Sequence, residues 1–170
     1  MYVDSHCHLS FPALSQRIDE IRRDMAAADV DRALCICTTM EEFDQVHALA
    51  MAHDNLWCTV GVHPDSEGVL EPTLNDLVTR AALPRVVGLG ETGLDYYRLN
   101  GRSVAEMAWQ RDRFRVHIQA AQLTGLPLVV RDGDSLPVAL TVRNNSTQPM
   151  KVAVSAKVLA GAAGAAPIAS

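Results

Sequence analysis

The stretch from Val86 to Gly93, VVGLGETG, is an apolar run that ends in a carboxylate set between glycines. A short apolar run bounded in this way has the character of a buried strand. The flanking glycines would let the backbone turn tightly beside a ligand. Glu91 is therefore either a solvated loop side chain or a functional group at the C-terminal end of a strand, where parallel α/β folds collect such groups.

The pattern of a short strand followed by a helix repeats through the first 130 residues. Apolar runs predict strands over residues 2–7, 33–37, 56–62, 85–90 and 127–130. Apolar residues at spacings of three and four predict helices over residues 14–28, 41–53, 73–82 and 103–124. Thr73 with Asp76 and Ser103 with Glu106 form capping-box patterns, and Gly125 is a stop signal. This alternation indicates repeated βαβ units, and hence an α/β fold with about five parallel strands and four helices.

The pattern changes after Val130. Residues 136–142 and 152–158 alternate apolar with polar side chains around a polar break, which predicts a two-stranded antiparallel hairpin. The Ala/Gly-rich end, residues 160–170, is expected to fray. We therefore predict two parts, residues 1–132 and 133–170.

Composition narrows the function classes. A net charge of −5 argues against a broad basic surface for nucleic acid, so any phosphate contact has to be local. No window approaches the ~18 apolar residues of a membrane span, and the N-terminus lacks a signal-peptide pattern, so we expect a cytoplasmic protein without a membrane partner. The four cysteines form no CxxC pair, which favours reduced, mostly buried thiols.

Four histidines are candidates for a functional or structural role beside Glu91. His6 and His8 share one face of the first predicted strand, where two imidazoles can converge on a divalent ion. Such a pair also occurs as hydrogen-bonded core or surface residues. His63, in the sequence GVHP, stands at another strand end, as a pocket residue or a loop histidine bonded to backbone. His117 lies on the inward stripe of a helix, which predicts a hydrogen-bonded core histidine.

Four linked motifs resemble the TatD family of metal-dependent deoxyribonucleases, amidohydrolase-like hydrolases with a TIM barrel. They are DSHCHL, GVHP, GLGETGLDYYR and the segment at residues 110–130, and the resemblance covers about residues 1–130. It implies a (β/α)₈-type barrel that hydrolyses DNA or another phosphodiester, usually DNA from the 3′ end. One or two divalent ions, Mg²⁺, Mn²⁺ or Zn²⁺, would serve as cofactor.

Carried over by position, the resemblance assigns roles to individual residues. His6, His8 and Glu91 would bind the metal, with Glu91 also the catalytic carboxylate. His63 would line the pocket where substrate binds. Apart from the resemblance, Arg98 on the next loop could contact phosphate and a tyrosine beside it could stack on a terminal base, although such Tyr-Tyr-Arg loops also serve packing and solvent contacts alone.

The sequence departs from the family pattern after the fifth strand. There the family has a ligand histidine followed by Thr-Arg-Asp-Ala, whereas here Val130 precedes Arg131 and Asp132, and no histidine occurs beyond His117. A TIM barrel takes about 250 residues. We therefore expect a truncated barrel with an unrelated tail, impaired hydrolysis and self-association through exposed sheet edges. The alternative is a non-catalytic remnant or interaction module that binds metal at most partially.

Overall fold

The computed structural model describes residues 2–130, which belong to one compact unit, Met1–Asp132. Its elements are β1 (Tyr2–Cys7), α1 (Pro12–Ser15), α2 (Ile18–Ala27), β2 (Val30–Cys35), α3 (Phe43–Ala52), β3 (Leu56–Val60), α4 (Leu74–Ala81), β4 (Val86–Thr92), the 3₁₀ turn η1 (Ala105–Met107), α5 (Ala108–Thr124) and β5 (Leu128–Val130). The predicted hairpin, the frayed end and the boundary at residue 132 lie outside the described residues.

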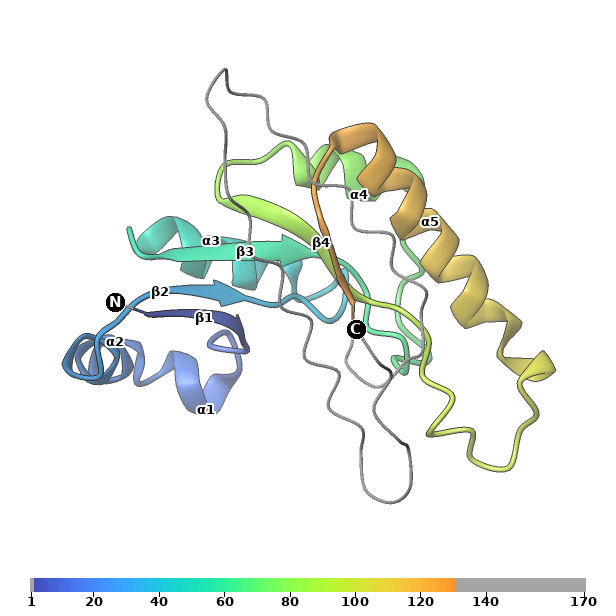
Figure 1. The fold of residues 1–170 in the computed structure, drawn as a ribbon, viewed down its shortest axis with the longest axis horizontal. Coiled ribbons are helices and arrows are strands. Elements are labelled where there is room, and N and C mark those ends of the chain that lie inside the picture. The colour runs from blue at the N-terminus through green and yellow to red at the C-terminus, as the bar shows by residue number, and fades with distance from the viewer. Residues whose placement is uncertain (1, 131–170) are drawn as a thin grey trace, which may run out of the picture. The chain divides into compact units, whose positions relative to one another are not determined.

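The five strands form one parallel sheet in chain order, β1-β2-β3-β4-β5 (Figure 1). This arrangement confirms the α/β class and the predicted number of parallel strands. Because every strand runs the same way, all five C-terminal ends lie along one edge of the sheet. Within the described residues, β1 and β5 are the two outer strands.

Element boundaries differ from the prediction where local pattern and tertiary packing disagree. The predicted helix at 14–28 is two helices, α1 and α2, separated at Arg17, whose φ and ψ are −117° and 22°. The apolar stripe hid this break because Ile18, Ile21 and Met25 still pack against the core. β2 begins three residues before the predicted start at 33, since Val30 already pairs with Tyr2.

The helices pack on one face of the sheet and form the core there. Alternate residues of β3, Leu56, Cys58 and Val60, are fully buried against this layer. The helices contribute Phe43, Val46 and Ala50 from α3, Leu77 and Ala81 from α4, and Ala120 from α5. No helix of residues 2–130 is long and apolar enough to cross a membrane.

Helix ends follow the predicted chemistry. Thr73 caps α4 through a complete capping box with Asp76. Ser103 and Glu106 exchange the same pair of bonds at η1, but α5 begins only at Ala108, five residues after the predicted helix start at residue 103. Gly125 ends α5 with φ of 72°, a left-handed conformation that favours glycine.

All four cysteines are free thiols, and three of them are buried, as the sequence predicted. Burial raises the pKa of both Cys37 and Cys58 to about 12, so these thiols stay protonated at neutral pH.

His117 is a fully buried histidine that joins α5 to the end of β3. Its Nε2 accepts a hydrogen bond from the backbone N–H of Val62 at 3.1 Å, which leaves the proton on Nδ1, and Nδ1 donates to the carbonyl of Arg113 at 2.9 Å. The predicted core role is confirmed. Burial lowers the pKa of His117 to about 4.

This histidine makes stability depend on pH. The unfolded chain takes up a proton below the ordinary pKa of 6.5, whereas the folded chain resists protonation down to about 4. Stability should therefore fall as pH drops through this window, with His117 accounting for about 2 kcal/mol between pH 7 and pH 5. Urea denaturation of the wild type and His117→Gln at both pH values measures this contribution. An equal loss of stability in the two proteins would contradict the assignment.

Candidate metal centre

The candidate site lies at the C-terminal ends of β1, β3 and β4. His6 is near the end of β1, and His8 follows that strand by one residue. Glu91 is the second-last residue of β4, and His63 lies three residues past the end of β3. The parallel sheet therefore gathers side chains that are far apart in the sequence at one edge.

Three of these side chains converge. In the described part of the chain, His6, His8 and Glu91 form the one cluster of His, Cys, Asp or Glu residues whose donor atoms all lie within 4.8 Å of one another. His6 Nε2 is 3.5 Å from Glu91 Oε2, and the two imidazole rings meet edge to face with centroids 5.2 Å apart. The arrangement can surround a single small cation.

The chemistry of the cluster fits a divalent ion. The side chain of Glu91 is only 7% exposed, and a buried carboxylate needs a positive or hydrogen-bonding partner. Nδ1 of His8 is buried and has no hydrogen-bond partner among the described residues, so this nitrogen is open to a ligand. Two imidazoles and a carboxylate suit Zn²⁺, Mn²⁺ or Fe²⁺, and the carboxylate also admits harder ions.

His63 faces the same cluster from β3. Its Nε2 is 3.8 Å from Glu91 Oε2, while its Nδ1 lies in contact with the Asp65 carboxylate. A carboxylate on one ring nitrogen fixes the orientation of the imidazole and leaves the other nitrogen directed at the site.

Arg98 reaches this histidine indirectly. Its Nη1 donates to Asp65 at 2.7 Å and to Asp95 at 2.9 Å. Asp95 also accepts hydrogen bonds from the backbone N–H groups of Tyr97 and Arg98, so the loop after β4 is held locally. The Arg98 side chain remains 47% exposed, which leaves part of its guanidinium open to a ligand.

Helix α5 holds these loops with buried polar side chains that pattern analysis missed. Gln110 binds both the N–H and the carbonyl of Asp95, and Arg113 donates to the carbonyl of His63 at 2.7 Å. Arg113 also pairs with Glu71. Residues 110, 113 and 117 share one helix face, and this spacing could have revealed a polar stripe on α5. The sequence could not show which backbone groups the side chains of the stripe would bind.

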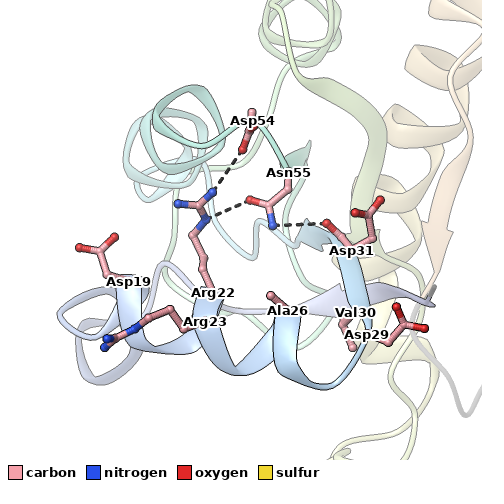
Figure 2. A pocket seen from close by; sticks show the side chains of 9 residues that line it. All are labelled: Asp19, Arg22, Arg23, Ala26, Asp29, Val30, Asp31, Asp54 and Asn55. Carbon is pink, nitrogen blue, oxygen red and sulfur yellow. Dashed lines mark hydrogen bonds and ion pairs between the residues drawn. The ribbon is translucent and has the colours of Figure 1, made fainter.

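A separate hollow of about 880 Å³ lies at the other end of the strands, where β2 begins (Figure 2). Arg22 crosses it and bonds to Asn55 and Asp54 at 3.0 and 3.2 Å. Asn55 donates to the carbonyl of Asp31. Active sites of parallel β/α barrels occupy the C-terminal face, so this hollow is not the candidate site.

Comparison with known proteins identifies the family. Residues 3–154 match the family of TatD related DNases. The chain belongs to this family. The match continues beyond residue 130, where the motif resemblance was expected to end, so the predicted boundary at residue 132 stays a prediction.

Relatives and solved structures agree with this assignment. The uncharacterized metal-dependent hydrolase YcfH of Escherichia coli K12 is 34% identical over 144 residues, which are 82% of this chain and 52% of YcfH. The 3′-5′ ssDNA/RNA exonuclease TatD of Enterobacter lignolyticus is 30% identical over 78% of this chain and 50% of its own length.

The crystal structure of the TatD homologue YjjV from Escherichia coli K12 superposes with a TM-score of 0.67 and 26% identity, covering 76% of this chain and 49% of YjjV. A TatD family hydrolase from Entamoeba histolytica has the same fold, with a TM-score of 0.57 and 21% identity over 72% of this chain and 46% of that protein. The chain thus spans about half the length of the curated relatives it matches. Its five-stranded sheet corresponds to part of the TatD barrel.

If the cluster binds metal, Mn²⁺ should stabilise the folded chain. At a free Mn²⁺ concentration of about 100 times the Kd, the bound ion should raise the Tm of the chain by about 5–10 °C. Glu91→Gln should abolish this shift because the amide removes the charged ligand, whereas Glu20→Gln, an exposed carboxylate on α2, should retain it. Differential scanning calorimetry with and without Mn²⁺ measures both. An undiminished shift in Glu91→Gln would place the ion elsewhere.

Proposed function

We propose that this chain carries part of the metal site of a TatD-type hydrolase whose substrate is a DNA phosphodiester attacked from the 3′ end. The observation that carries the proposal is the convergence of His6, His8 and Glu91 at strand ends in a chain of the TatD related DNase family. The name of the Enterobacter relative, a 3′-5′ ssDNA/RNA exonuclease, supports the choice of substrate.

The chemistry follows from the donor set. His6, His8 and Glu91 would hold a divalent ion, Mg²⁺, Mn²⁺ or Zn²⁺, which when bound lowers the pKa of water and polarises a phosphoryl oxygen. His63 is oriented by Asp65 with Nε2 toward Glu91, so in its doubly protonated form it can donate a hydrogen bond from Nε2 to a phosphate oxygen held there.

The loop after β4 supplies contacts of the kind that the end of a DNA strand needs. The half-exposed guanidinium of Arg98 can bind phosphate with the donors that Asp65 and Asp95 leave open. Tyr97 is 96% exposed on this loop, and its backbone N–H is anchored to Asp95. An exposed aromatic ring on an anchored backbone can stack on an unpaired terminal base.

We further propose that hydrolysis by this chain is weak. The family's ligand histidine after the fifth strand has no counterpart here, since no histidine follows His117. Three protein ligands with water can retain an ion, so metal binding need not be lost with activity.

We also propose the cytoplasm as the compartment of this protein, because the free thiols of the described residues are compatible with a reducing compartment.

Hydrolysis of a 3′-labelled single-stranded oligonucleotide with Mn²⁺ or Mg²⁺ tests the proposal. Turnover should be about 100-fold or more below that of the Enterobacter exonuclease, because loss of an outer partner of a metal ligand already costs about 10–100-fold. His6→Ala and Glu91→Ala should abolish the remaining activity.

The variants, purified in parallel, separate true activity from contaminating nuclease. Turnover equal to that of the relative and abolished by both substitutions would refute the impairment. Residual turnover unchanged by both substitutions would refute the hydrolase assignment itself.

A second candidate function is an interaction module. Tyr2 and Val3 of the outer strand β1 are 67% and 59% exposed. A hollow of about 290 Å³ on the sheet is lined by Val3, Ser5, Arg32, Ala33, Leu34, Trp57 and Val87. Exposed apolar surface beside an outer strand favours pairing with another chain. Self-association in sedimentation velocity, together with no metal-dependent hydrolysis, would favour this reading.

A further inference from the structure

Thr59 is a polar side chain without any exposed surface, on β3 beside the strand β4 that carries Glu91. Its backbone pairs with Gly88 of β4, two residues before Gly90. Its methyl group packs over Gly88, which directs the hydroxyl toward the strand ends. A buried hydroxyl must find hydrogen-bond partners, and those of Thr59 are backbone groups next to Glu91.

Three hydrogen bonds close a ring around this hydroxyl. Thr59 Oγ1 accepts from the N–H of Cys37 at 3.1 Å and donates to the carbonyl of Gly90 at 2.5 Å. The N–H of Glu91 completes the ring by donating to the carbonyl of Cys37 at 2.8 Å. The two ends of the Gly90–Glu91 peptide are thus held by one hydroxyl and one carbonyl.

The backbone of the site leaves little room for adjustment. A Cβ on Gly61 would lie 2.6 Å from the Cα of Gly90, so the ends of β3 and β4 touch backbone to backbone. Gly90 has φ of 143°, a conformation that side chains rarely allow. The direction in which the Glu91 side chain points from β4 therefore depends on the hydrogen bonds made by the Gly90–Glu91 peptide.

We propose that Thr59 is a positioning residue for the Glu91 carboxylate and so sets the affinity of the site for a divalent ion. The inference rests on the proposed function, since it assumes that Glu91 binds the metal. A methyl group in place of the hydroxyl would leave the Cys37 N–H and the Gly90 carbonyl without this partner. It would also press on the Gly90 oxygen at a distance too short for a carbon atom. The peptide before Glu91 would then move away from His6 and His8.

Calorimetric titration of the full chain with Mn²⁺ tests the proposal. Thr59→Val should weaken Mn²⁺ binding by about tenfold or more, as removing a partner that orients a metal ligand does elsewhere. Thr59→Ser keeps the hydroxyl and should stay within about twofold of the wild type. Val46→Ala, in the core of α3, controls for lost stability because it makes no hydrogen bond to the ring.

The outcomes are distinct. Wild-type affinity in Thr59→Val, or an equal loss in Val46→Ala, would overturn the positioning role. If Thr59→Val fails to fold, Thr59→Ala, which removes the hydroxyl without the added methyl, carries the same expectation and the same refutation. A wild-type chain that binds no Mn²⁺ would overturn both the metal site and the positioning role. Mn²⁺ binding by the wild type with the same affinity in the Thr59 variants would overturn only the positioning role.

Discussion

The candidate site depends on two adjacent carbonyl groups just past the end of β2. The carbonyl of Cys37 accepts the N–H of Glu91, and that of Thr38 accepts the N–H of His63, both at 2.8 Å. These bonds extend from β2 to the ends of both β3 and β4, beyond the regular ladder, which pairs β2 with β3 only as far as Cys35 and Cys58. The parallel order of the sheet brings the strand ends to one edge, and this pair of bonds fixes the two functional side chains there. Residues far from the candidate metal ligands, such as those of α5, then hold the loops that follow.

Much of the fold was predictable because its signals are local. β1 has the predicted bounds, and the capping box of Thr73 and the stop at Gly125 act as expected. Such features depend on side-chain period and on hydrogen bonds within a few residues. The division into α1 and α2 was missed because the break at Arg17 leaves the apolar stripe in phase. The early start of β2 was missed because polar Asp31 and Arg32 obscure a strand that exists through pairing with β1.

The site was predictable only in part, for a related reason. His6 and His8 could be paired from their shared strand face and Glu91 recognised at a strand end, while the family resemblance joined the three as one metal site. The structure brings their donor atoms within 4.8 Å of one another. The supporting residues Asp65, Thr59 and Gln110 could not be assigned from sequence, since no periodicity says which buried polar group meets which backbone atom. Arg98, predicted to contact phosphate, is also an ion-pair partner of Asp65 and Asp95, so its substrate role stays a prediction.

The central claim is that His6, His8 and Glu91 form a metal site in this chain. Anomalous diffraction from crystals grown with Mn²⁺, recorded on both sides of the manganese absorption edge, tests it most directly. We predict one strong anomalous peak within bonding distance of all three side chains. A peak that touches none of them, or no peak with Mn²⁺ well above its measured Kd, would contradict the account.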